Sequence, residues 1–325
     1  MSDQAETRIP PELRPEQGEL GYKLDDALDA VVSLQAHIPE DAFTASILGT
    51  ERAGHGVIIG DTGLIVTIGY LVTEADQIWV VTNAGQAVTG HLVGYDYETG
   101  FGLIQALGRL DAPVMELGSS DALQVGEELV VAGCGGVEEA LKVHVAARRE
   151  FAGYWEYVLD DALFTTPAHP NWGGAALIGG DGRLCGIGSL YIDQIVPELP
   201  NVDGNLSVPI DYLKPIMEEL QMYGRTLKPA RPWLGMFVSE VEDRFMIAGV
   251  YNDAPATAAG LQAGDVVLDI GGRPPTDLSG LFRSMWAVGP AGCDIPFRVE
   301  RDGETLEIAV TSVDRRDFWK APSFH

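Results

Sequence analysis

Short apolar runs separated by glycine dominate the chain between residues 43 and 133. They cover residues 56–59, 63–67, 77–81, 102–104 and 128–133. Runs of this length at regular spacing, bounded by turn residues, are typical of strands in a barrel or a sandwich. The pattern predicts a mainly β fold for this part of the chain.

Two stretches with apolar residues at helical spacing flank these strands. Residues 24–34 place Leu24, Leu28 and Val31 on one face, and residues 209–222 follow the same spacing behind Pro209, which suits a helix start. We therefore expect a helix at each end of the β region. Residues 1–23 are polar and contain proline, and they predict a flexible N-terminal tail.

A second unit follows a proline-containing linker at residues 224–232. The expected strands lie near 234–239, 245–251, 265–270, 294–300 and 305–312, with a helix near 277–287. The dipeptide Asp302-Gly303 between the last two strands is typical of a tight hairpin turn. Roughly 90 residues are enough for a small independent domain. We predict a tail at 1–23, a β domain at 24–226 and a small domain at 227–318.

The net charge restricts the partners of this chain. Lys and Arg total 21 and Asp and Glu total 48, which gives a net charge of −27. Such a field repels nucleic acid and anionic membrane surfaces. No apolar run approaches the roughly 18 residues that a membrane span needs. We therefore predict no nucleic-acid partner and no membrane span.

The start of the chain bears on its location. It lacks the charged and then apolar pattern of a signal peptide, so the chain as written is expected to be cytoplasmic. A chain trimmed of its signal would have the same appearance and would be periplasmic.

Cysteine and histidine usage argues against a disulfide framework and a metal site. The three cysteines, Cys134, Cys185 and Cys293, are widely spaced and odd in number, which fits reduced thiols. The sequence has no Cys-x-x-Cys and no histidine pair at metal-ligand spacing on a helix. We predict no metal and no cofactor.

Several motifs in one order resemble the HtrA/Deg family. They are GHGVII (54–59), GYDYET (94–99), LGSS (117–120), GRLCGI (182–187), NLSVPI (205–210) and DAPATAAGLQAGD (253–265). The resemblance covers about residues 45–315. It implies a trypsin-like double six-stranded β-barrel followed by a PDZ domain, and assembly as a homo-oligomer, commonly a trimer.

The same resemblance identifies the positions of a serine-protease site, and none holds the expected residue. Tyr70 stands at the histidine position, Gly100 at the aspartate position and Trp172 at the serine position. A phenol with a pKa of about 10 is a poor base, glycine cannot orient one, and an indole cannot attack a carbonyl. Pro170, at an oxyanion-donor position, has no N–H. The expectation is a pseudoprotease with no catalytic residues, and therefore not an enzyme.

An alternative is an active serine endopeptidase with an unrecognised arrangement. Its hydroxyl would come from Ser119, Ser120 or Ser189, although none lies in a Gly-x-Ser-Gly-Gly context. Its base would come from the six histidines, which are His37, His55, His91, His144, His169 and His325. His169 is more typical of a loop residue, and Cys185, in an apolar strand, is more typical of a buried thiol.

The PDZ resemblance implies a peptide-binding groove. PDZ domains add a peptide strand to a sheet edge and hold its terminal carboxylate with backbone N–H groups. The resemblance assigns those groups to Leu234, Gly235 and Met236. The other residues assigned to the groove are Trp233, Phe237, Leu278, Leu281, Phe282 and Met285. A different interpretation is that the apolar side chains form the small domain's core.

These observations lead to three hypotheses for function. The first is a non-catalytic HtrA-like protein that binds peptides or protein partners through its PDZ domain, with the barrel domain as a scaffold. Its partner would be a C-terminus with a hydrophobic last residue, because the groove is apolar. The second is the serine endopeptidase described above, and the third is an assembly subunit of a larger cytoplasmic complex.

Overall fold

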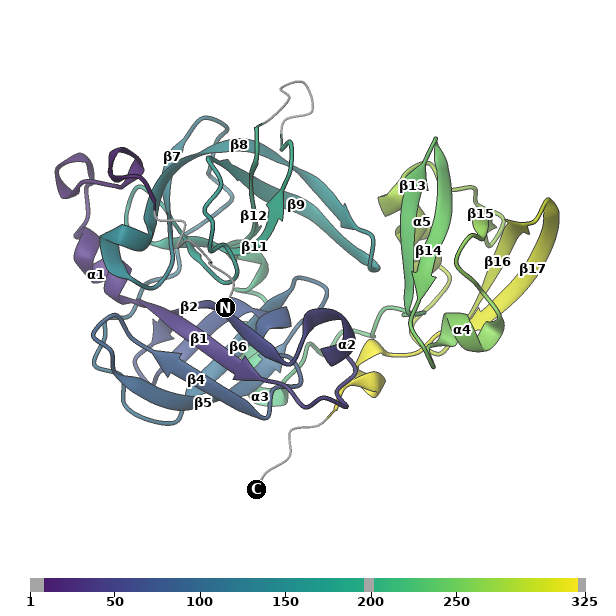
Figure 1. Ribbon diagram of the computed structural model, residues 1–325, viewed down its shortest axis with the longest axis horizontal. Helices are drawn as coiled ribbons and strands as arrows, with labels where there is room; N and C mark the ends of the chain where they lie inside the picture. The colour runs from purple at the N-terminus through teal and green to yellow at the C-terminus, as the bar shows by residue number, and fades with distance from the viewer. Residues whose placement is uncertain (1–8, 196–201, 321–325) are drawn as a thin grey trace, which may run out of the picture. The chain divides into compact units, whose positions relative to one another are not determined.

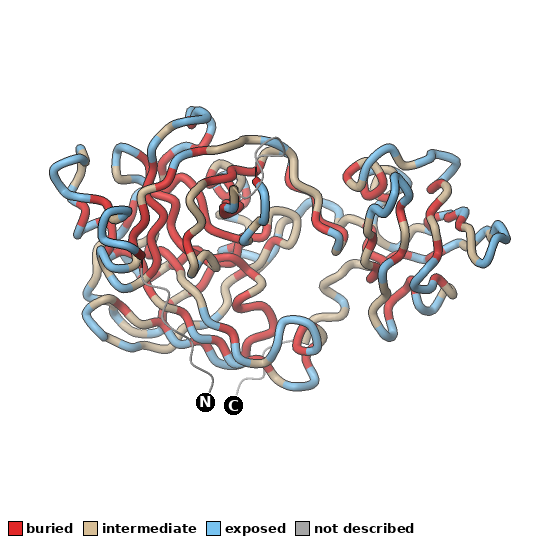
Figure 2. The backbone as a smooth tube through the Cα atoms, turned by 45° about the horizontal axis from the view of Figure 1, so that its top comes forward, coloured by how far each residue is buried: buried red, intermediate tan, exposed pale blue. Residues whose placement is uncertain are grey.

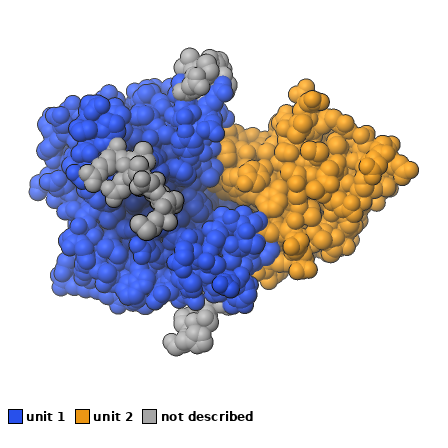
Figure 3. Space-filling view, in the orientation of Figure 1, with its two compact units in different colours: residues 1–149, 161–226, 320–325 blue, residues 150–160, 227–319 orange. Residues whose placement is uncertain are grey.

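The computed structural model describes residues 9–195 and 202–320, and it divides the chain into two compact units (Figure 1). The first unit contains residues 1–149, 161–226 and 320–325, and the second contains residues 150–160 and 227–319 (Figure 3). The main part of the second unit begins at residue 227. The segment 150–160 was expected in the β domain, but it groups with the second unit.

The first unit begins with a closed barrel of six antiparallel strands. Its strands are β1 (Val31–His37), β2 (Glu51–Gly60), β3 (Leu64–Ile68), β4 (Gln77–Val81), β5 (Ala87–Tyr95) and β6 (Phe101–Ala106). Their order is β1-β2-β3-β6-β5-β4, and β1 closes the ring by pairing with β4. Alternate side chains point inward, so Val57, Ile65 and Leu103 are fully buried in the barrel.

A second closed barrel completes this unit. Its strands are β7 (Glu128–Ala132), β8 (Ala140–Gly153), β9 (Tyr157–Thr166), β10 (Ala176–Ile178), β11 (Leu184–Ile192) and β12 (Gly204–Pro209). Their order is β10-β11-β12-β9-β8-β7. The buried residues follow the strands as continuous red stretches in Figure 2. The two rings confirm the predicted mainly β architecture with six strands in each barrel.

The second unit is built on one antiparallel sheet. Its strands are β13 (Met236–Val241), β14 (Arg244–Val250), β15 (Val266–Ile270), β16 (Asp294–Arg301) and β17 (Glu304–Thr311). They lie in sequence order, so β13 forms one edge of the sheet. The helices of this unit are α4 (Pro255–Ala259) and α5 (Leu278–Trp286). Asp302 and Gly303 both have positive φ, 53° and 81°, as the predicted hairpin turn requires.

Both helices predicted for the first unit are shorter than expected. The helix at 24–34 ends early: α1 is Leu24–Asp29, and Val31 already begins β1 because it pairs with Val57. The helix at 209–222 is divided into a 3₁₀ turn, Ile210–Tyr212, and α3, Met217–Tyr223. Pro215 lies between them, and proline cannot donate the backbone hydrogen bond of a helix interior.

The remaining helical segments are short. They are α2 (Ala45–Leu48) and the 3₁₀ turns Pro11–Leu13, Gln17–Glu19, Gly69–Leu71, Gly136–Glu139 and Arg315–Phe318. Of the predicted tail 1–23, residues 1–8 lie outside the described residues. Ile9 is buried with the second barrel's core, and Arg14 Nε donates to its carbonyl oxygen at 2.9 Å. None of the helices in residues 9–195 and 202–320 has the length and apolar composition to cross a bilayer.

Candidate functional site

A cavity of about 370 Å³ lies in the first unit, between residues of its two barrels. It is lined by Ser33, Ala53, Gly54, His55, Tyr70, Leu71, Pro170, Asn171, Trp172 and Gly173. Three of the four predicted protease-site positions, Tyr70, Pro170 and Trp172, therefore lie together at this cleft. Gly100 is not among the lining residues.

Backbone contacts fix the loop that carries Trp172. The His55 N–H donates to the Gly173 carbonyl at 2.8 Å, and the Gly174 N–H donates to the Gly188 carbonyl at 2.9 Å. Gly174 has a φ of 77°, and a Cβ there would lie 1.9 Å from the carbonyl oxygen of His55. Only glycine fits this position, because it needs both a left-handed backbone and the absence of a side chain. Backbone hydrogen bonds and the left-handed Gly174 thus hold the loop directly after residue 172.

Tyr70 and Trp172 interact inside the cleft. The Tyr70 hydroxyl donates to the Ser189 carbonyl at 2.9 Å and has a side-chain hydrogen bond with Trp172. Burial raises the pKa of Tyr70, and the hydrogen bond from Trp172 opposes that rise. The Trp172 ring also lies 5.6 Å from the Tyr191 ring, centroid to centroid. Tyr70 is therefore a neutral hydrogen-bonding group at neutral pH, because its proton is held more tightly than that of a free phenol.

Gly100 occupies a tight turn near the first barrel. Its carbonyl accepts from the Gly69 N–H at 2.7 Å, and its own N–H donates to the Asp96 carbonyl at 2.7 Å. The Asp96 carboxylate accepts from the backbone and the hydroxyl of Thr99 at 3.0 and 2.7 Å. Asp96, four residues before the aspartate position, thus stabilises its own turn.

The two histidines near the cleft are held by backbone groups. His169 is fully buried, its Nδ1 accepts from the Asn171 N–H at 3.0 Å, and its Nε2 lies 3.1 Å from the Glu139 carbonyl. His55 Nδ1 accepts from the Cys134 N–H at 3.0 Å. Burial, together with the nearby His169, lowers the pKa of His55 to about 4. Both rings serve structural hydrogen bonds in this conformation.

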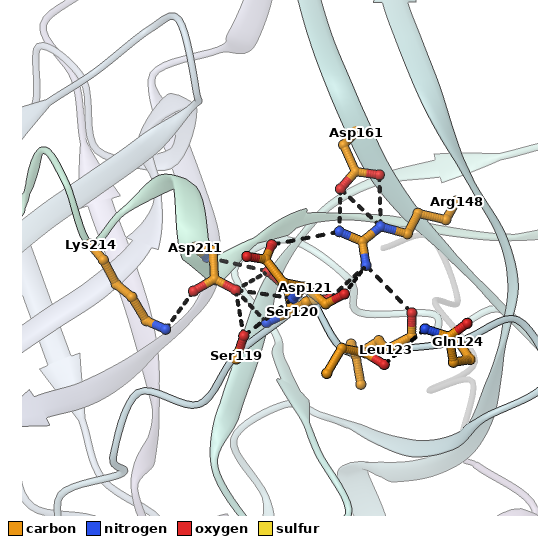
Figure 4. Close-up of polar contacts among 10 residues, drawn as sticks. Ser119, Ser120, Asp121, Leu123, Gln124, Arg148, Asp161, Asp211 and Lys214 are labelled. Carbon is orange, nitrogen blue, oxygen red and sulfur yellow. Dashed lines mark hydrogen bonds and ion pairs between the residues drawn. The ribbon is translucent and has the colours of Figure 1, made fainter.

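The candidate serines lie in other networks. Ser119 Oγ and Ser120 Oγ donate to the Asp211 carboxylate at 2.8 and 2.9 Å, and Lys214 binds its other oxygen at 2.5 Å (Figure 4). Although burial opposes the change, hydrogen bonds from Lys214, Ser119 and Ser120 lower the pKa of Asp211. Within the described residues, no hydrogen bond joins Ser119, Ser120 or Ser189 to a histidine.

Arg148 extends this network across the second barrel. Its guanidinium forms a bidentate pair with Asp161 and donates to the Ser120 carbonyl at 2.8 Å (Figure 4). Such planar bidentate pairs fix side-chain geometry. The network has the features of a structural cross-link between β8, β9 and the loop at 119–123.

Cys185 has the environment of an inert thiol. It is buried in the second barrel's core, and burial raises its pKa to about 11. A thiol with a raised pKa is a weak nucleophile at neutral pH. In residues 9–195 and 202–320, no group of three or more His, Cys, Asp and Glu side chains is arranged to hold a metal ion.

The second unit contains the other predicted site, at the edge strand β13 and helix α5. Leu234, Met236, Leu281, Phe282 and Met285 are all buried in one apolar cluster, and Leu278 packs against it partly exposed. Much of the predicted groove lining therefore also forms the core. Two aromatic residues at or near β13 remain partly accessible. They are Phe237 and Tyr251, whose ring centroids lie 4.8 Å apart.

Three backbone N–H groups of this unit converge on one carboxylate. Leu234, Gly235 and Met236 donate to the side chain of Glu156 at 3.1, 2.7 and 2.9 Å. Gly235 has a φ of 76°, and a Cβ there would lie 2.4 Å from the Ala254 side chain. The three donors were predicted from the sequence, whereas Glu156 was not. The available signal was an acid among Tyr154, Trp155 and Tyr157 at a strand turn.

Comparison with known proteins gives the same two-part organisation. Residues 54–187 match the trypsin-like peptidase domain, and residues 232–311 match the PDZ domain. A relative named probable periplasmic serine endoprotease DegP-like, from Halomonas elongata, is 30% identical over 288 residues, covering 82% of this chain and 57% of the relative. The relative of the same name from Pseudomonas fulva is 27% identical over 287 residues, with the same coverage.

Solved structures agree on the fold. The HtrA-type protease AlgW with tripeptide superposes with a TM-score of 0.52 at 23% identity, covering 89% of this chain and 95% of that one. The serine endoprotease from Yersinia pestis gives 0.51 at 21% identity, covering 91% and 99%. These matches confirm the predicted fold class, a trypsin-like double barrel followed by a PDZ domain.

The relatives overturn two predictions made from the sequence. They are named serine endoproteases, so the prediction that the chain is not an enzyme is wrong. They are also named periplasmic, so the prediction of a cytoplasmic protein is wrong. The hypothesis of an assembly subunit in a cytoplasmic complex is not supported for the same reason. The chain spans 57% of the length of the Halomonas and Pseudomonas fulva relatives.

Proposed function

We propose that this HtrA-like protein, in which a trypsin-like peptidase domain is joined to a PDZ domain, captures the C-terminus of a peptide or protein in its PDZ groove. One observation carries the proposal: the N–H groups of Leu234, Gly235 and Met236 already hold a carboxylate at 2.7–3.1 Å. A terminal carboxylate presents the same two oxygens as a glutamate side chain, so the same three donors suit it.

The strand next to these donors supports peptide pairing. β13 is an edge of the five-stranded sheet, so one side of it has no partner within that sheet. Its Val238 N–H donates to the carbonyl of Tyr154 at 2.9 Å, outside the sheet. An extended peptide would use this edge in the same way. The apolar side chains of Leu278 and Phe237 are partly accessible, and they favour a hydrophobic last residue in the peptide.

The test is binding of a labelled peptide that ends in valine, measured by fluorescence anisotropy with the full chain. The matched control is the same peptide with an amidated C-terminus, which keeps every side chain and removes the charge. We expect at least tenfold weaker binding of the amide, since hydrogen bonds to charged groups contribute about 1.5–3 kcal/mol. Equal binding of the two peptides would exclude recognition through the carboxylate loop.

A second candidate function is endoproteolysis in the periplasm, which the names of the relatives favour. We propose that Tyr70, Gly100, Pro170 and Trp172 do not carry that chemistry, because an indole has no electron pair suited to attack a carbonyl and proline has no N–H for an oxyanion. Hydrolysis by this chain therefore requires a nucleophile from another residue.

Incubation with unfolded casein, together with a fluorophosphonate probe, tests this second candidate. Cleavage with covalent labelling of a serine supports it, and mass spectrometry of the labelled peptide identifies the nucleophile. His55→Ala is an informative variant, because His55 lines the cleft, whereas His144→Ala on the exposed face of β8 is its matched control.

Sedimentation of the same sample measures whether the chain forms the homo-oligomer, a trimer, that the family resemblance implies.

A further inference from the structure

The segment 150–160 is the part of the second barrel's longest hairpin that belongs to the second compact unit (Figure 3). It contains the end of β8, the turn and the start of β9. A hairpin tip normally has few contacts beyond its own strands. This tip instead contributes a side chain, a backbone carbonyl and two flanking carboxylates to the PDZ domain.

The tip reproduces the two polar features of a bound peptide. Glu156 places its carboxylate against the N–H groups of Gly235 and Met236 at 2.7 and 2.9 Å. Two residues earlier, the Tyr154 carbonyl accepts from the Val238 N–H, two residues further along β13. The segment therefore runs antiparallel to β13 with its carboxylate at the strand's start. A peptide added to a PDZ sheet edge runs in that direction.

Apolar contacts accompany this pairing. Val158 is 6% exposed and belongs to the same buried cluster as Met236 and Phe282, and Ala152 packs against that cluster. The Tyr154 ring lies 5.9 Å from the Phe237 ring. The tip thus packs against the apolar cluster of this unit and against Phe237, where the last residues of a peptide are expected to bind.

An arginine of α5 holds both sides of the hairpin. Arg283 Nη2 donates to Glu150 and, at 2.5 Å, to Asp160 Oδ1. These acids lie at the two ends of the segment 150–160. One guanidinium on the groove's helical wall therefore fastens the tip across its base, while Glu156 anchors its end.

The environment of the Glu156 carboxylate is closed and partly positive. Glu156 is 6% exposed, and the charged and titratable groups that act with it are Arg315 and Tyr251. Arg315 attracts the ionised form, whereas burial opposes it. Glu156 also has a φ of 61°, an uncommon conformation for a residue other than glycine.

We infer that the hairpin tip 150–160 is an intramolecular ligand of the PDZ groove, and that an incoming peptide C-terminus must displace Glu156 to bind. The inference rests on the proposed function, because it assigns the regulation of the same groove. A groove that is open for only a fraction of the time binds its ligand more weakly by that fraction. The docked tip thus raises the peptide concentration that is needed to occupy the groove.

The experiment compares three full-length proteins: the wild type, Glu156→Ala and Glu307→Ala. Glu307 is an exposed carboxylate on β17, at the opposite edge of the same sheet, so its variant controls for the loss of one negative charge. Binding of the valine-terminated peptide is measured by anisotropy. We expect at least tenfold tighter binding by Glu156→Ala and unchanged binding by Glu307→Ala.

Hydrogen exchange in the absence of peptide gives an independent readout. The amides of Leu234, Gly235 and Met236 should be protected in the wild type and should exchange faster in Glu156→Ala, while the β16 and β17 amides stay protected in both. Retained protection in β16 and β17 also shows that the variant is folded.

The outcomes separate the inference from the proposed function. If the peptide binds the wild type and Glu156→Ala equally well, the tip is not a competitor and the inference is wrong, although the groove still binds peptides. If no protein binds the peptide but the three amides lose protection in Glu156→Ala, the tip does dock and the proposed function is wrong. If the amides are unprotected in the wild type, the inference is wrong whatever the peptide does.

Discussion

The inter-barrel cleft and the PDZ groove both contain side chains of the same chain, but these side chains differ in how they are attached. In the cleft, Trp172 belongs to a loop that backbone hydrogen bonds fix to both barrels, and it contacts Tyr70 beside a cavity of about 370 Å³. In the groove, Glu156 reaches donors that are 78 to 80 residues away in the sequence. The cleft is thus lined by its own walls, whereas the groove is occupied by a separate segment that, by our inference, a ligand can replace.

The difference concerns chemistry as well as attachment. The groove retains the N–H donors that its proposed function needs, so its occupant resembles a ligand. At the four positions that the family resemblance assigns to the protease site, the chain has instead a phenol, a glycine, a proline and an indole. We therefore propose that the groove is regulated by displacement of its occupant, and that any hydrolysis by this chain uses a residue other than these four.

The largest effect is expected where the groove is also the core. Phe282→Ala removes a fully buried ring from the cluster that supports the groove, and should lower the free energy of unfolding of the PDZ unit by about 3–5 kcal/mol. Chemical denaturation followed on that unit's transition measures it. Val288→Ala, at an exposed position after α5, is the control and should change stability by less than about 0.5 kcal/mol. A small effect of Phe282→Ala would mean that the groove wall is separate from the core.

The second-largest effect is expected from pH, because ionisation of Glu156 changes how strongly its side chain docks in the groove. Burial raises the pKa of Glu156 to about 7 from 4.5, while the N–H groups of Met236, Leu234 and Gly235 oppose the rise. The docked carboxyl binds its proton more tightly than the released one, so docking weakens as the pH rises from about 4.5 to 7, by up to about tenfold per pH unit. Above pH 7 both forms are ionised and the dependence ends.

The measurement is the pH dependence of the Gly235 amide chemical shift in the absence of peptide. It should titrate near pH 7 in the wild type and should show no such step in Glu156→Gln, which keeps the side-chain shape without the ionisation. A step of the same size in Glu156→Gln would assign the titration to another group.

A smaller effect is expected in the cleft. Tyr70→Phe removes the hydroxyl that donates to the Ser189 carbonyl and leaves both that oxygen and the Trp172 indole without this partner. The expected loss is about 1–3 kcal/mol in the unfolding transition of the barrel unit, the usual cost of buried groups left unsatisfied. Tyr191→Phe, whose hydroxyl binds Asp203 at an exposed site, is the matched control and should cost less. Equal costs would show that the cleft is hydrated.

The smallest effect is expected from the arginine at the base of the hairpin. Arg283→Gln weakens two partly exposed ion pairs, with Glu150 and Asp160, and such pairs contribute about 0.2–1 kcal/mol each. We expect peptide binding to become about two- to fivefold tighter, and the gain to shrink at high salt because salt already screens the pairs. The control is Arg244→Gln, which breaks an exposed ion pair with Glu300 on the sheet of the PDZ unit. This variant should leave peptide affinity unchanged.

The sequence predicted local features of the fold more accurately than contacts between distant segments. The short apolar runs near 56–59, 63–67, 77–81, 102–104 and 128–133 correspond to β2, β3, β4, β6 and β7, and Asp302-Gly303 predicted the β16–β17 turn. The arrangement of two six-stranded barrels came from the family resemblance. The helix expected at 24–34 was wrong beyond Ala30, because pairing of Val31 with Val57 favours a strand there. Apolar spacing alone does not distinguish these two states over so short a segment.

For the candidate sites, resemblance supplied positions but not partners. Leu234, Gly235 and Met236 were named as carboxylate donors from the motif around them. Glu156 was missed because its role depends on the hairpin folding against a domain that begins about 70 residues later in the chain. The predictions about enzymatic activity and location were wrong for another reason: they were drawn from absent side chains and an absent signal pattern, which the named relatives outweigh.

The left-handed Gly174 has a consequence for redesign. Because the backbone from 173 to 175 is fixed through Gly188 and the His55 peptide group, we expect another residue at 172 to project in the same direction as Trp172. A hydroxyl or thiol grafted at this position would inherit that orientation without remodelling of the scaffold. The cleft can therefore receive new chemistry by exchange of side chains alone.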